Sequence, residues 1–173
     1  YTYNADGYIW KYLGVDKTTA RAASENDQNY IIYRLADVLL MKAEALIMQG
    51  HNEDAADLID RTRERAGLGE TTLSDDRMVM LETLLVERQK EFFGEGKNWF
   101  DLLRIGLRSE QLNDTQYKTL FVEQALKAVG ASRQSLGRAT LANSGSWYLP
   151  YSEDELSKNP LLEQSDYYQS ISN

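Results

Sequence analysis

The chain has 173 residues, 42% of them hydrophobic and 27% charged, which is the composition of a globular protein with a buried core. Its formal net charge of −8 argues against nucleic acid and anionic membranes as main partners, because both would repel it. The absence of cysteine excludes disulfides, thiolate metal sites and cysteine nucleophiles, and the one histidine, His51, is expected in a solvated turn.

Residues 1–29 are polar and rich in tyrosine, and they show no helical period. A short strand is predicted between Tyr8 and Leu13, in which Tyr8 and Trp10 point to one face. Aromatic rings stack on the apolar C–H faces of sugars, so Tyr8 and Trp10 are candidates for carbohydrate binding. The alternative interpretation is that this face packs against the following helices.

A helical hairpin is predicted after Tyr30. The first helix is indicated by apolar residues at helical spacing, namely Ile31, Leu35, Val38, Leu39 and Leu46, and it ends at Gly50. The second is expected to begin after Asn52 as N-cap, to bury Ala55, Ala56, Leu58 and Ile59, and to end at Gly67. The spacing is typical of a tetratricopeptide-type repeat, and a faint second copy 46 residues later predicts another hairpin opening near Ser74.

An unusual charge pattern follows in residues 84–104. Glu87, Glu91 and Glu95 recur every four residues, so a helix places them on one face. Gly94 and Gly96 are expected to end this helix, and Asn98 to cap a short segment over residues 99–104. We expect a structural cluster of ion pairs beside the core, formed by Arg34, Glu87, Arg88, Glu91, Asp101 and Arg104.

Two catalytic alternatives use the same carboxylates. Paired carboxylates hydrolyse glycosides, and glutamates on facing helices bind di-iron centres. Glycosidase acids usually come from separate elements that flank a cleft, however, and the Glu-x-x-His motif of di-iron sites is missing. The structural interpretation is therefore favoured.

The remaining sequence predicts one more helix and an irregular tail. An amphipathic helix is expected from about Asp114 to Val129, followed by a loop over residues 130–146 and a short strand at residues 147–149. Trp147 borders that loop and is the third candidate for stacking on a sugar. Ser152 and Glu155 form a capping box for a short helix that Asn159 and Pro160 end.

Four ordered motifs resemble the SusD/RagB family, the surface glycan-binding lipoproteins of Bacteroidetes nutrient-uptake systems. Residues 87–104 resemble its E-R-x-x-E-x-x-x-E-G helix and the W-F-D-L-x-R segment after it, and residues 10–12 its KY strand. Residues 33–45 resemble RYADVLLMxAEA, and residues 148–167 resemble the closing LxPIPxxEIxxNPxLxQNxGY. Two details depart from that closing motif: Asp166 stands where a glycine usually precedes the tyrosine, and Tyr151 replaces the second isoleucine-proline step.

The resemblance implies a mainly α-helical fold, a SusD-like superhelix of tetratricopeptide-like hairpins with short strands and long loops. We expect one C-terminal domain over residues 1–173, comprising a strand and loop segment (1–29), helical hairpins (30–106), a variable insertion (107–146) and a closing tail (147–173). Family members are several hundred residues long and begin with a lipidated cysteine, so the chain is expected to correspond to the C-terminal part of such a protein.

The implied function is capture of an oligosaccharide without catalysis and its delivery to a SusC-like TonB-dependent transporter of the outer membrane. No cofactor or metal is implied, and membrane association is expected only through a lipid anchor outside this segment. The alternative is a tetratricopeptide-type protein-interaction module with no carbohydrate role.

Overall fold

The computed structural model describes residues 30–172, and within that range every regular element is a helix. The described residues divide into two compact units, one within residues 1–98 and the other within residues 99–173. The prediction of a mainly α-helical protein is confirmed, whereas the strand predicted at Tyr8–Leu13 lies outside the described residues.

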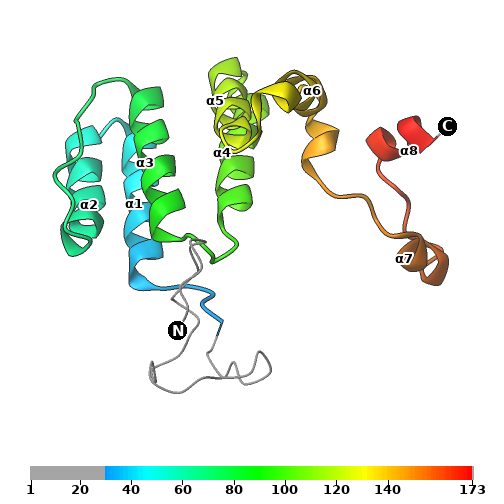
Figure 1. Ribbon diagram of the computed structural model, residues 1–173, viewed down its shortest axis with the longest axis horizontal. Helices are drawn as coiled ribbons and strands as arrows, with labels where there is room; N and C mark the ends of the chain where they lie inside the picture. Colours follow the sequence, from blue (N-terminus) through cyan, green and yellow to red (C-terminus); the bar gives the residue numbers. More distant parts are fainter. Residues whose placement is uncertain (1–29, 173) are drawn as a thin grey trace, which may run out of the picture. The chain divides into compact units, whose positions relative to one another are not determined.

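The first unit contains three helices, α1 (Leu35–Gln49), α2 (Asn52–Arg65) and α3 (Arg77–Glu91). They lie side by side in Figure 1, and each contacts the other two. Fully buried aliphatic side chains form the core between them: Leu40, Ala43, Ile47, Ala55, Ile59, Leu81 and Leu84. The predicted helical hairpin is therefore present, and a third helix covers it.

The buried face of α1 differs from the predicted one. Leu35 and Val38 are 69% and 54% exposed, whereas Leu40 and Ala43 are fully buried. Because α1 is apolar over much of its circumference, its sequence fits two adjacent faces equally well, and packing against α2 and α3 selects one of them. The selected face also carries Asp37, which is 1% exposed.

The ends of the helices follow local rules in most places. Gly50 adopts φ +83° after α1, and Asp76 caps α3 by accepting hydrogen bonds from the backbone N–H groups of Met78 and Val79. The predicted N-cap of α2 is wrong by one residue. His51 occupies the cap position, and the Asn52 side chain instead donates to the Ser74 carbonyl at 2.9 Å.

The second unit contains α4 from Trp99 onward (α4 spans Asn98–Leu112), α5 (Thr115–Leu126), α6 (Ala131–Leu141) and the 3-10 helix η3 (Ser144–Trp147). Two short helices close it, α7 (Glu153–Lys158) and α8 (Asp166–Ser172). Gly106 lets α4 approach closely, since a Cβ there would lie 3.0 Å from both the Phe121 and the Trp147 rings. Those two rings pack with centroids 4.5 Å apart in the core of the unit.

Three local predictions in this unit are wrong. Residues 131–141 form α6 rather than loop, Trp147 ends η3 rather than starting a strand, and α4 extends well beyond residue 104. The sequence of α6 carries no apolar period that could have indicated a helix. In agreement with this, no residue of α6 is buried. A Cβ at Gly137 would lie 2.5 Å from Leu126 Cδ2, so α6 can contact α5 here only because this residue is a glycine.

Candidate functional site

An ion-pair cluster surrounds the C-terminal end of α3. We call it the charge knot and define it by Asp37, Glu87, Arg88, Glu91 and Glu95, all at most 8% exposed, with the cations that contact them. Glu87, Arg88 and Glu91 come from the last turns of α3. Glu95 comes from the turn that follows, in which Gly94 and Gly96 adopt positive φ.

Arg34 links the start of α1 to this turn. Its guanidinium contacts a Glu91 carboxylate oxygen, and donates to Glu95 Oε1 at 2.9 Å and to the Glu91 carbonyl at 2.7 Å. Two neighbouring bonds fix the same stretch, because the Tyr30 hydroxyl donates to the Glu95 carbonyl and Lys97 Nζ donates to the Ile32 carbonyl. Residues 30–34 are thus held along residues 91–97.

The other acids of the charge knot have partners on α2 and α3. Glu91 also pairs with Arg65 at 2.6 Å, and Glu87 pairs with Arg63 at 2.9 Å. Asp37 accepts from Arg88 at 2.9 Å and pairs with Lys97. The cluster therefore links all three helices of the first unit through charge-assisted hydrogen bonds.

The Phe92 ring lies among the cations of the charge knot. The Arg34 and Arg88 guanidinium carbons are each 4.8 Å from its centroid, and Lys97 Nζ is 5.1 Å away. The ring is 4% exposed, so these cation–π contacts form where little water competes.

Two protonation equilibria are shifted by these contacts. Burial by itself raises the pKa of Asp37, but hydrogen bonds from Lys97 and Arg88 outweigh it and hold the pKa below its ordinary value. Burial lowers the pKa of Arg34, and its hydrogen bonds to Glu95 and Glu91 more than reverse this and raise the pKa. Both groups therefore stay charged at neutral pH.

Of the six residues predicted as one cluster, Arg34, Glu87, Arg88 and Glu91 belong to the first unit, and Asp101 and Arg104 belong to the second. Arg34 and Glu91 pair directly, while Glu87 and Arg88 pair with residues outside the predicted set. Asp101 and Arg104 pair with each other within α4, at 3.1 Å.

The predicted set lacked several contributors, namely Asp37, Arg63, Arg65, Lys90, Glu95 and Lys97. The basic end of α2 was the available signal. Arginines at the C-terminus of a helix compensate its dipole, and Arg63 and Arg65 in addition reach acids on α3.

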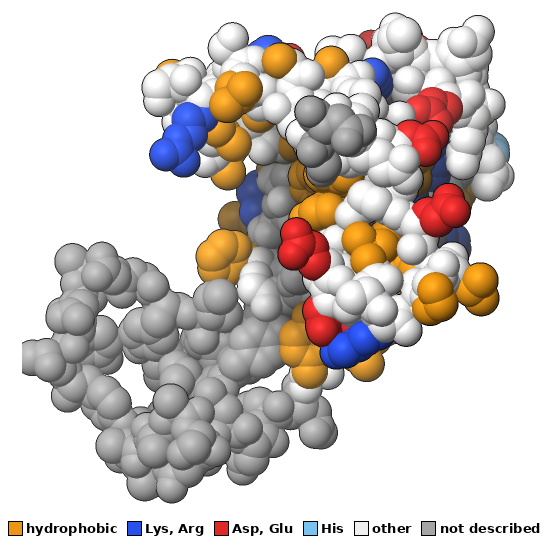
Figure 2. Space-filling view, turned by 90° about the vertical axis from the view of Figure 1, so that its right-hand side faces the viewer, with side chains coloured by type: hydrophobic (Ala, Val, Ile, Leu, Met, Phe, Trp, Pro, Cys, Tyr) orange, Lys and Arg blue, Asp and Glu red, His pale blue; other side chains and the backbone are white. Residues whose placement is uncertain are grey.

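In the part of the chain that the structure describes, no group of three or more acidic or histidine side chains is arranged to hold a metal ion. Each glutamate of the predicted stripe contacts at least one arginine. On the face drawn in Figure 2, acidic side chains lie among polar and hydrophobic ones rather than in one patch. These contacts allow the charge knot to fix the three helices of the first unit relative to one another.

The three sugar-stacking candidates have different outcomes. Tyr8 and Trp10 lie outside the described residues. Trp147 is 2% exposed, packs on Phe121 and donates its indole N–H to the Leu141 carbonyl at 2.9 Å. A ring so deeply buried cannot stack on a sugar, so Trp147 is a core residue and that prediction is corrected.

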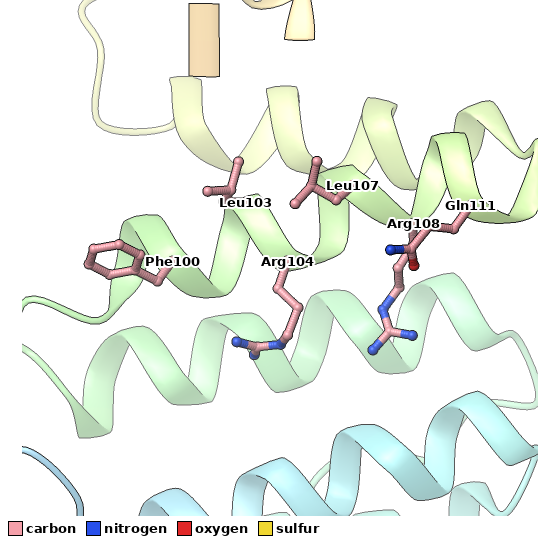
Figure 3. A pocket seen from close by; sticks show the side chains of 6 residues that line it. All are labelled: Phe100, Leu103, Arg104, Leu107, Arg108 and Gln111. Atoms are coloured by element: carbon pink, nitrogen blue, oxygen red, sulfur yellow. The ribbon is translucent and has the colours of Figure 1, made fainter. Parts of the chain in front are cut away.

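One open groove of about 300 Å³ runs along α4. It is lined by Phe100, Leu103, Arg104, Leu107, Arg108 and Gln111. Figure 3 shows the leucines and the arginines on different sides of the helix, so the groove presents an apolar edge and a basic edge.

Comparison of the sequence with models of known protein families identifies the family of this chain. The model of the SusD family matches residues 2–168. The chain belongs to the SusD family.

Named relatives of this SusD-family chain come from Formosa agariphila. SusD-like protein P38 is 37% identical over 47% of the chain, and SusD-like protein P2 is 36% identical over 58%. SusD-like protein P25 is 27% identical over 92% of the chain. The chain spans 18%, 21% and 28% of the lengths of these three relatives.

A solved structure supports the same assignment. The crystal structure of a SusD superfamily protein from Bacteroides fragilis matches 79% of the chain with a TM-score of 0.55 and 28% sequence identity. The match covers 28% of that protein. The fold predicted from the sequence motifs is thereby confirmed.

Proposed function

We propose that this SusD-family chain is part of a non-catalytic protein that binds oligosaccharides at the cell surface. The protein would deliver them to a SusC-like TonB-dependent transporter for polysaccharide uptake. The observation that carries the proposal is the family match over residues 2–168. The described helices supply the scaffold in this proposal.

The state of the acidic residues supports binding rather than hydrolysis. Glu87, Glu91 and Glu95 are almost fully buried and contact arginines. Glycoside hydrolysis requires a general acid with a raised pKa and a second carboxylate that faces it across a cleft. Carboxylates that are buried and held by arginines suit a structural role, and we propose that no cofactor or metal takes part.

The proposed location is the outer face of the outer membrane, through a lipid anchor outside this segment. None of the helices in the described range has the length and hydropathy that a membrane crossing requires. The net charge of −8 disfavours nucleic acid as a partner, and a neutral glycan is indifferent to it.

Affinity electrophoresis of the complete gene product in gels that contain soluble polysaccharides tests glycan binding. We expect retardation by at least one neutral polysaccharide, with no release of reducing sugar. Retardation by none, together with capture of a helical protein partner, would contradict the proposal and favour the tetratricopeptide-type interaction module. Binding to the transporter is tested separately by co-purification with the SusC-like protein of the same organism, and failure to co-purify would reject that partner.

Substituting the buried glutamates separates binding from hydrolysis. Glu87→Gln and Glu91→Gln are expected to lower stability without changing any measured hydrolysis. Loss of a hydrolytic activity with the fold intact would instead indicate a glycoside hydrolase.

A further inference from the structure

The extended segment between η3 and α7 is held from two sides by the closing residues. The Tyr168 hydroxyl donates to the Tyr148 carbonyl at 2.7 Å. The Gln164 side-chain amide bonds to both backbone groups of Tyr151, donating to its carbonyl at 3.0 Å and accepting from its N–H at 3.2 Å. Pro150 restricts the backbone between these anchors. Residues 148–151 are therefore preorganised although they belong to no helix.

This segment presents two tyrosine rings to solvent. Tyr148 and Tyr151 are each 49% exposed, in contrast to the neighbouring Trp147. Among the described residues, neither phenol group makes a hydrogen bond, and neither ring packs on another ring or on a cation. A tyrosine on a fixed backbone offers an apolar face and a hydroxyl at a small entropic cost, which is what stacking on a sugar ring requires.

Several acidic residues lie close to the two tyrosines in the sequence. Glu153 and Glu155 are exposed residues of the first turn of α7, and Glu163 precedes the anchoring Gln164. Ionised carboxylates accept hydrogen bonds from sugar hydroxyls. Residues 148–168 carry five acids and one base, Lys158, which is already paired with Asp154 at 2.6 Å. A uronate or sulfate group would be repelled here.

We propose that Tyr148 and Tyr151, with the carboxylates of Glu153 and Glu155, form a binding platform for neutral oligosaccharides. The two rings stack on successive sugar units, and the carboxylates bind their hydroxyls. This inference rests on the proposed glycan-binding function and adds to it a location and a chemical class, neutral rather than anionic glycans.

The test uses affinity electrophoresis and calorimetry on the complete gene product with defined probes. Laminarin, xyloglucan and soluble starch are the neutral polysaccharides, and polygalacturonate and chondroitin sulfate are the anionic ones. We compare the wild type with Tyr148→Ala/Tyr151→Ala, and with Phe93→Ala as a control. Phe93 is 66% exposed and lies in the other compact unit.

The double variant is expected to bind its neutral polysaccharide at least about tenfold more weakly, and Phe93→Ala to bind as the wild type does. A second variant, Tyr148→Phe/Tyr151→Phe, keeps both rings and is expected to retain most of the affinity even if the alanine variant is unstable. Circular dichroism checks the fold of each.

Two results would overturn the platform and leave the proposed function intact. One is unchanged binding in the folded alanine variant, and the other is a wild type that prefers the anionic polysaccharides. Absence of binding to every probe would overturn the proposed function and, with it, the platform.

Discussion

At the scale of single residues, Arg34 connects the start of α1 to the acids of the charge knot. Its guanidinium reaches two acids, Glu91 and Glu95, whose side chains are 6% and 0% exposed. Removing one partner of a buried pair leaves a carboxylate without full compensation, which costs far more than losing a pair in water.

Arg34→Ala is therefore expected to lower the free energy of unfolding by about 3 kcal/mol. Urea denaturation followed by circular dichroism measures this change. Arg138→Ala is the matched control, because it removes an arginine whose partner, Glu123, is exposed, and little change is expected there. Equal losses of unfolding free energy in the two variants would show that burial of the carboxylates does not determine how much an ion pair contributes to stability.

Asp37 gives a pH-dependent prediction. Its pKa in the folded protein lies below the ordinary value of an aspartate, so the unfolded chain binds the proton more readily. The stabilisation is complete above the unfolded pKa of about 3.9 and is lost as the pH falls through the lower folded value.

Asp37→Asn is consequently expected to cost about 3 kcal/mol at pH 7 and progressively less below about pH 4. Urea denaturation of the variant and the wild type at pH 7, 5 and 3 measures the difference. A penalty that stays constant over this range would mean that the Asp37 charge is not the source of stability.

At the scale of elements, α3 depends on its N-terminal cap. The Asp76 carboxylate accepts from Met78 N at 2.7 Å and from Val79 N at 3.4 Å, which satisfies two of the free donors of the first turn. Asp76→Ala is expected to lower the free energy of unfolding by about 1 kcal/mol. The neighbouring Asp75→Ala removes an equal charge without a cap, and a similar loss there would contradict this explanation.

The packing of α4 on α5 depends on a glycine, Gly106, which has no side chain to keep the two helices apart. In a helix interior, Gly→Ala normally adds up to about 1 kcal/mol of stability. At Gly106 the new methyl group would meet two buried rings, Phe121 and Trp147, at 3.0 Å. We expect overpacking to dominate, so that Gly106→Ala destabilises by about 1 kcal/mol. An increase in the thermal midpoint would show that the rings move aside easily.

At the scale of the whole molecule, the division into two units at residue 98 leads us to predict that each unit loses local stability independently of the other. Arg34→Ala should raise hydrogen exchange rates in α1, α2 and α3, and Gly106→Ala should raise them in α4, α5 and η3. Mass spectrometry of peptides after exchange measures both. If α4 instead responds together with α1–α3, the segment 30–106 expected from sequence motifs is the better description of the folding unit.

Local patterns in the sequence account for much of the fold. Helical period and glycine positions predicted the helix pair α1 and α2, and the four ordered motifs indicated the SusD family. The four-residue spacing of Glu87 and Glu91 places both on one face of α3, since the α-helical repeat is local. These features depend on residues a few positions apart, so the sequence contains the information directly.

Other features depend on contacts between distant residues. The sequence did not show which apolar face of α1 is buried. It also did not show that Asp37 pairs with Arg88 and Lys97, or that Arg63 and Arg65 reach α3. It also suggested Trp147 as an exposed ring, whereas the structure buries it and exposes Tyr148 and Tyr151. The sequence by itself determined the family and the helices that carry a clear apolar period, such as α1 and α2, because helical periods and motifs are local. Only the tertiary structure decided which side chains meet and which face solvent, because that depends on how the helices pack.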